Sequence, residues 1–161
     1  MRHLTIALAV GALLLLLCSN CSFMDKMYAA QKIDQVATPI PFTTLENYFV
    51  RNDVDCSKQQ RLILDNKTDF EHFFGMGTFM GGMPTDVNWN KQYVVALVLP
   101  ETNRETIITP IDVRQDGDNV VLCYKVERGH ENLSYTMVPF TAVAIDKPAT
   151  DQQMHIFFLE K

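Results

Sequence analysis

The order of apolar and polar positions predicts one β-rich domain over residues 42–161. Residues 93–99 form a continuous apolar run in which β-branched side chains are frequent. Such a run is typical of a strand that is buried on both faces. Shorter strands are expected at residues 48–50, 61–64, 134–137, 140–145 and 154–159. The predicted fold class is α+β and β-dominated, either an antiparallel meander sheet or a small barrel-like sandwich.

A β-hairpin is predicted where residues 106–114 and 119–127 flank the pair Asp116-Gly117. An Asp-Gly pair between strand-like segments is a strong hairpin signal, because glycine accepts the backbone angles of a tight turn. Pro110 lies inside the first of these strands and has no backbone N–H to donate. We therefore expect Pro110 at a sheet edge or in a β-bulge.

One short helix is predicted near residues 69–75. Thr68 and Glu71 have the spacing of a capping box, in which each side chain bonds a free backbone N–H at the helix start. Three phenylalanines then fall on one face of the helix, and Gly75 is expected to end it. These are Phe70, Phe73 and Phe74.

The first residues predict a lipoprotein-type signal peptide over 1–21. Arg2 precedes an apolar run at residues 4–17. This run is long enough for an export signal and shorter than the ~20 residues that span a bilayer. The alternative is an uncleaved membrane anchor that extends to Met24. Export predicts a protein of the cell envelope, anchored on the periplasmic or outer-surface side, or otherwise secreted.

Cys21 is the predicted lipidation site, with Cys18 as the alternative, because a cysteine soon after the apolar run is typical of a lipoprotein signal. Acyl chains would hold the protein at a membrane, since each buried methylene contributes about 0.8 kcal/mol. Ordinary cleavage near Ser22 stays open and would release the protein. Residues 22–41 end in two prolines and are interpreted as a tether between anchor and domain.

The charge of the chain narrows the classes of partner. Its net charge is −5, with acidic and basic residues interspersed. Nucleic-acid binding depends on clustered Lys and Arg, and docking on an anionic membrane surface also needs basic residues. The sequence therefore argues against both, and the membrane is expected as a partner through the lipid anchor.

Cys56 and Cys123 are a candidate disulfide. Loss of the leader with acylation of one cysteine leaves this even pair in an oxidising compartment. A bridge would close a loop of about 67 residues and contribute ~4 kcal/mol on the chain-entropy model. The alternative is two separate thiols, with Cys123 buried in an apolar strand as part of the core.

A Gly- and Met-rich stretch at residues 75–84 is the candidate partner-contact loop. It follows a predicted helix, whereas a phosphate-binding loop follows a strand and opens a helix, so nucleotide binding is disfavoured. Methionine side chains adapt to many partner surfaces, and exposed apolar loops usually mark contact sites. The candidate contact residues are Met76, Phe79, Met80 and Met83. With His72, these methionines could instead offer soft ligands to Cu(I).

No catalytic motif stands out in the sequence. His72, His130 and His155 are widely separated, without the paired spacing of a metal site, so no metal and no cofactor are predicted. A thiol- or His-dependent hydrolase that uses Cys56 or Cys123 stays open as an alternative, because it depends on spatial adjacency. A non-enzymatic role is the main expectation.

Residues 87–147 resemble the C-terminal domain of bacterial PrcB-like proteins. The likeness lies in Asn88-Trp89-Asn90 followed by an apolar strand, and in later segments at residues 107–113, 120–126 and 138–147. In place of that family's glycine-rich turn after the first strand, this chain has Pro100 to Glu105. PrcB-like proteins are small exported accessory proteins, the best known of which associates with an extracellular protease complex. The resemblance implies a non-catalytic accessory module that binds a protein, for instance a protease.

Overall fold

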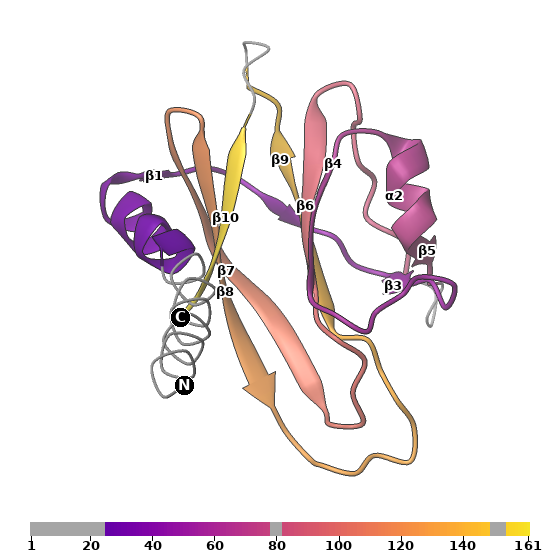
Figure 1. Cartoon of the computed structure of the whole chain (residues 1–161). Coiled ribbons are helices and arrows are strands. Elements are labelled where there is room, and N and C mark those ends of the chain that lie inside the picture. Colours follow the sequence, from indigo (N-terminus) through magenta and orange to yellow (C-terminus); the bar gives the residue numbers. More distant parts are fainter. Residues whose placement is uncertain (1–24, 78–81, 149–153) are drawn as a thin grey trace, which may run out of the picture.

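The computed structural model describes residues 25–77, 82–148 and 154–161 (Figure 1). Residues 25–36 are helical. The strands and the second helix follow in the order β1 (Thr38–Pro39), β2 (Thr43–Thr44), β3 (Tyr48–Val50), β4 (Gln60–Leu64), α2 (Lys67–Phe73), β5 (Phe74–Met76), β6 (Gln92–Val98), β7 (Thr106–Asp116), β8 (Asn119–Arg128), β9 (Phe140–Asp146) and β10 (His155–Glu160).

Two four-stranded sheets pack face to face, which confirms the predicted β-dominated fold in its sandwich form. One sheet has the order β1-β7-β8-β10 and the other has the order β2-β9-β6-β4. The space between the sheets is filled by one apolar cluster, whose fully buried members are Val95, Leu97, Val113, Val120, Leu122, Val143 and Ile145. Burial of this cluster is the main source of stability in such a sandwich.

Strand β6 is buried on both faces, as its continuous apolar run predicts. Val95 and Leu97 point between the two sheets, whereas Val94 and Ala96 point to the other side. There they pack in a second cluster with Phe70 and Phe74, which belong to α2 and β5. Figure 1 shows α2 beside β4 and β6, on the opposite side of the sandwich from the helical residues 25–36.

The predicted hairpin is confirmed as β7 and β8, which pair from Asp116 and Asn119 outward. Gly117 in the turn has a φ of 57°, a backbone angle that glycine adopts without steric cost. The register shifts between Pro110 and Asp112, so Pro110 lies at the predicted β-bulge. The bulge accommodates a residue that cannot donate a backbone hydrogen bond.

Two strand predictions need correction. Residues 154–159 were expected to close an antiparallel meander, but β10 pairs in parallel with β8, for example Phe158 with Leu122. Alternation along a strand reports which faces are buried and not the direction of the neighbouring strand, so the sequence does not reveal this pairing. Residues 134–137 do not form a strand; only an isolated bridge joins Met137 to Thr102.

Residues 25–41, the described part of the segment interpreted as a tether, pack against the domain. The helix 25–36 packs on the outer face of β8 and β10, where Ala30 is 1% exposed. Strand β1 then pairs with β7, with Thr38 opposite Gln115. The apolar side chains of β8 on this outer face would otherwise be exposed to water, and covering them stabilises the docked helix. The packed domain therefore includes residues 25–41.

Candidate partner-binding groove

The helix α2 sets one wall of the candidate site. Its N-cap is Asn66 and not the predicted Thr68, which lies inside the helix. Oδ1 of Asn66 accepts a 2.9 Å hydrogen bond from the backbone N–H of Asp69, and Nδ2 of Asn66 donates a 2.8 Å bond to Oδ2 of Asp69. Asparagine is among the best N-caps, and it starts the helix two residues earlier than expected. The helix ends at Phe73, and Gly75 belongs to β5.

Strands β3 and β5 form the second wall as a short antiparallel pair. Phe49 lies opposite Gly75, and its ring covers the glycine so closely that a Cβ atom at this position would overlap it. A larger residue at this position would have to displace the ring of Phe49. The pair brings Tyr48 on β3 next to Met76 on β5.

Four aromatic side chains form the floor between these walls. Phe70 lies at their centre, with ring centroids 5.0 Å from Tyr48, 5.0 Å from Phe74 and 5.4 Å from Trp89. The contact with Tyr48 is edge-on and the contact with Phe74 is stacked, both favourable geometries for aromatic pairs. Phe70 is 3% exposed, so the floor is anchored in the core.

Hydrogen bonds join Met83 and Thr85 to residues 46–48, at the start of β3. Oη of Tyr48 donates a 2.8 Å hydrogen bond to the carbonyl oxygen of Thr85, and Oγ1 of Thr85 accepts a 3.0 Å bond from the N–H of Glu46. Nδ2 of Asn47 donates a 3.0 Å bond to the carbonyl oxygen of Met83. These contacts fix residues 83 and 85 against residues 46–48.

The resulting groove has a volume of about 610 Å³. Its lining combines the aromatic floor with two methionines and a rim of three charged residues. The lining residues are Tyr48, Lys67, Phe70, Glu71, Phe74, Met76, Met83, Pro84, Asp86, Val87 and Trp89. Met83 is 84% exposed and Met76 is 59% exposed, so two large apolar side chains face solvent at the edge of the groove.

The rim of the groove is weakly acidic. Lys67 pairs with Glu71 at 3.6 Å, and Asp86 adds a further negative charge. Burial raises the pKa of Tyr48, and the charges of Asp86 and Glu71 raise it further. The Tyr48 hydroxyl therefore stays protonated and acts as a hydrogen-bond donor.

Of the four predicted contact residues, Met76 and Met83 line this groove. Phe79 and Met80 lie outside the described residues. The aromatic floor was not predicted as part of the site, although Phe70 and Phe74 of the predicted helix and the single tryptophan of the chain belong to it. Their position could be known only with the tertiary pairing of α2, β3 and residues 83–89.

The candidate disulfide is not formed: Cys56 and Cys123 are both free and buried. Cys56 lies in the cluster under α2, and Cys123 lies in the cluster under the helix 25–36. The cluster between the two sheets separates them, which explains why an even cysteine count gives no bridge here. The core alternative for Cys123 is the one that the structure supports.

Neither thiol has the surroundings of a nucleophile. Burial raises the pKa of Cys56, and the nearby Asp55 and Glu101 raise it further. Burial and a hydrogen bond to Asp34 raise the pKa of Cys123 to about 11. A catalytic cysteine needs the opposite shift, because the thiolate is the reactive form.

None of His72, His130 and His155 lines the groove. His72 is absent from the groove lining and packs its ring 5.4 Å from that of Phe73, whereas His155 lines a different hollow. Among the described residues, no group of three His, Cys, Asp or Glu side chains could hold a metal ion. The signal peptide and the lipidation sites Cys18 and Cys21 lie outside the described residues.

Comparison with protein-family models, with curated proteins and with solved structures found no match to this chain. Within the part of the chain that the structure describes, no helix is both long and apolar enough to cross a membrane.

Proposed function

We propose that this chain is a non-enzymatic accessory module of the cell envelope, held by a lipid anchor and binding a protein partner through the groove. The single observation that carries the proposal is the pair of exposed methionines, Met76 and Met83, above an aromatic floor. Methionine-rich hollows adapt to apolar side chains of different shape and are frequent on protein-binding surfaces.

The chemistry of the groove favours one kind of partner segment. Its apolar floor suits an aliphatic or aromatic side chain as an anchor, since such anchors contribute most of the binding free energy at interfaces. The rim carries one lysine and two carboxylates, Lys67, Glu71 and Asp86. We expect a basic side chain of the partner next to the apolar anchor. The resemblance to PrcB-like proteins makes an exported protease the first partner to test.

The lipid anchor is proposed from the leader alone. The apolar run at residues 4–17, followed by Cys18 and Cys21, is the motivation. The mass of the mature N-terminal peptide decides it: acylation at Cys21 or Cys18 supports the anchor, and an unmodified N-terminus near Ser22 contradicts it.

The groove is tested by capture of a partner from envelope extract with matched surface variants. Met76→Asp combined with Met83→Asp places two charges over the aromatic floor and is expected to reduce capture at least about tenfold. The control is Ile107→Asp combined with Ile111→Asp, because these side chains are 54% and 49% exposed on β7. Equal loss in both variants, or capture that the groove variant leaves unchanged, contradicts the proposal.

A further inference from the structure

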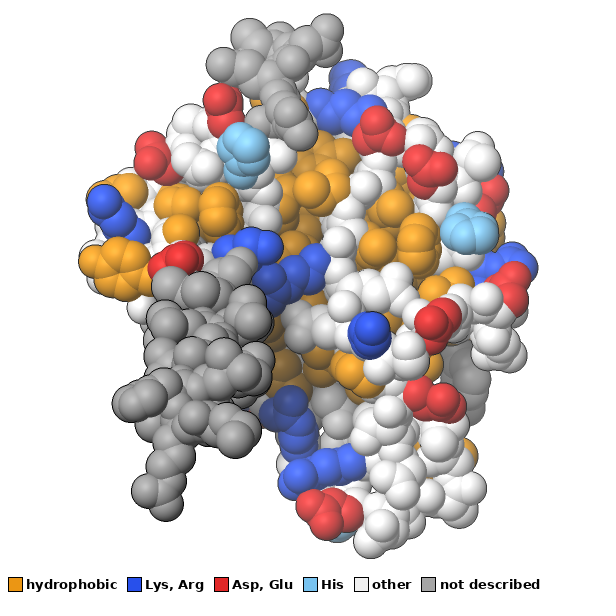
Figure 2. All heavy atoms as spheres, viewed as in Figure 1, with side chains coloured by type: hydrophobic (Ala, Val, Ile, Leu, Met, Phe, Trp, Pro, Cys, Tyr) orange, Lys and Arg blue, Asp and Glu red, His pale blue; other side chains and the backbone are white. Residues whose placement is uncertain are grey.

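A second hollow lies between the start of the helix 25–36 and the edge strands β4 and β10. Its volume is about 310 Å³, and Figure 2 shows hydrophobic side chains along the middle of this face with Lys and Arg beside them. Ile63 at its border is 51% exposed. The lining residues are Lys26, Met27, Arg61, Ile63, His155, Ile156, Phe157 and Phe158.

The lining of this hollow combines positively charged and apolar side chains. Lys26 and Arg61 bring two positive charges, and none of the described residues that line the hollow is acidic. The guanidinium carbon of Arg61 lies 5.5 Å from the ring centroid of Phe158, so this cation is held across the gap between the two sheets. The local charge is thus opposite in sign to the net charge of −5.

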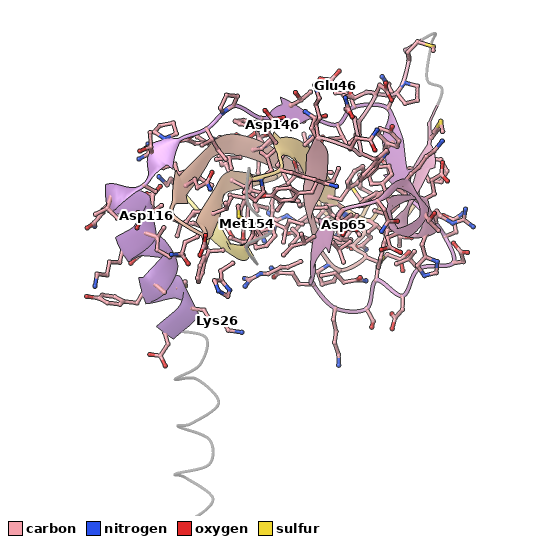
Figure 3. All side chains as sticks on the ribbon, turned by 90° about the horizontal axis from the view of Figure 1, so that it is seen from above. Lys26, Glu46, Asp65, Asp116, Asp146 and Met154 are labelled. Carbon is pink, nitrogen blue, oxygen red and sulfur yellow. The ribbon has the colours of Figure 1, made fainter. Side chains whose placement is uncertain are left out.

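The hollow lies at the beginning of the described helix 25–36, because Lys26 and Met27 line it. Figure 3 shows Lys26 in the first turn of the described helix, with Glu46 and Asp146 on the far side of the molecule. The helix is held against the domain through Asp34, which pairs with Lys161 at 2.7 Å. Three residues separate Cys21 from Asp25. A chain of this length spans at most about 14 Å, so a lipid on Cys21 keeps the hollow close to the bilayer.

We infer that this hollow, which we call the basal hollow, faces the membrane and binds the phosphate groups of anionic lipids through Lys26 and Arg61. The inference rests on the proposed lipid anchor. The net negative charge disfavours adsorption of the free protein, and the anchor overcomes this by holding the basal hollow at the surface. The helix 25–36 and α2 lie on opposite sides of the sandwich, so the groove stays accessible to a partner (Figure 1).

The test uses the full acylated protein in vesicles of phosphatidylcholine, with or without phosphatidylglycerol. A fluorophore is attached at Ile63→Cys in the basal hollow or at Ile111→Cys on β7, and nitroxide lipids quench it on contact. Quenching at residue 63 that requires phosphatidylglycerol and is absent at residue 111 supports the inference. Lys26→Glu and Arg61→Glu should each reduce this contact about fivefold.

Matched controls separate a local effect from a general one. Lys58→Glu and Arg128→Glu remove exposed cations outside the basal hollow and should leave the quenching unchanged. Unfolding midpoints of all variants report whether they fold. Flotation with vesicles but no selective quenching at residue 63 contradicts the inference and leaves the anchor standing. A protein that does not float with vesicles contradicts the anchor, and the inference with it.

Discussion

Oδ2 of Asp34 accepts a 2.7 Å hydrogen bond from Nζ of Lys161, which joins the helix 25–36 to the residue after β10. Oδ1 of the same carboxylate lies 3.4 Å from Nε of Arg114 and accepts a hydrogen bond from the thiol of Cys123 at 3.3 Å. The Asp34 side chain is 16% exposed. One carboxylate thus connects the helix to β7, to β8 and to the end of the sheet.

Replacement of Asp34 with Ala should loosen the helix without unfolding the sandwich. The variant leaves the cations of Arg114 and Lys161 without this carboxylate, and we expect a loss of about 1–2 kcal/mol in helix docking. Amide hydrogen exchange of residues 25–36 measures it directly. Asp25→Asn, at an exposed position of the same helix, is the control. Unchanged exchange in Asp34→Ala would refute the role of this contact.

Docking of the helix 25–36 should weaken at low pH. Burial alone would raise the pKa of Asp34, but hydrogen bonds from Lys161 and Cys123 and the nearby positive charges lower it below 3.8 overall. As pH falls, the carboxylate of Asp34 is therefore protonated in the undocked state before it is protonated in the docked state. Its contribution to docking is complete above pH 3.8 and is lost as pH falls through the lower pKa of the docked state. Exchange of residues 25–36 should rise over that acid range in the wild type. Asp34→Asn should lack this step, and the same step in both proteins would exclude Asp34 as its source.

The thiol of Cys123 should react very slowly in the folded protein. It is fully buried, and its pKa is raised to about 11. A thiol reagent at neutral pH should label neither cysteine until the protein unfolds, and then label both. Labelling of Cys123 should accelerate in Asp34→Ala, because opening of the helix exposes it. A mass shift of the mature protein on reduction would instead indicate that the Cys56–Cys123 bridge exists.

Gly75→Ala should destabilise the wall of the groove, because the added methyl group overlaps the ring of Phe49. We expect a cost of about 1–3 kcal/mol in chemical unfolding. Phe49→Ala in the same chain should recover part of it by removing the ring. Gly117→Ala is a useful comparison: its Cβ meets no atom, so its cost comes from the positive φ alone. Equal costs with and without Phe49 would rule out the overlap.

The apolar run of β6 and the turn at Gly117 were predictable because both signals are local. Seven consecutive apolar or amphipathic positions require cover on two faces, and the structure supplies it from β8 on one side and α2 on the other. The bulge at Pro110 follows from a missing N–H in the same local way. Such features need no knowledge of distant partners.

The packing of the helix 25–36 and the position of the groove could not be predicted from local sequence patterns. Two apolar residues, Ala30 and Ile33, are too few to predict that one face of this helix is buried. The residues that they contact, Val121 and Cys123, lie about 90 positions further along the chain. The floor of the groove joins Tyr48, Phe70 and Trp89 from three separate segments. The predicted Cys56–Cys123 disulfide is wrong for the same reason. An even number of cysteines does not show on which side of a sheet each thiol lies.

Photo-cross-linking in living cells tests the proposed groove most directly. A photoreactive amino acid at position 83 should capture one discrete envelope protein, identified by mass spectrometry, whereas the same group at the exposed position 107 on β7 should not. Binding of that protein should also change the fluorescence of Trp89, the only tryptophan of the chain. Cross-links from position 107 alone, or none from position 83, would contradict a partner-binding groove.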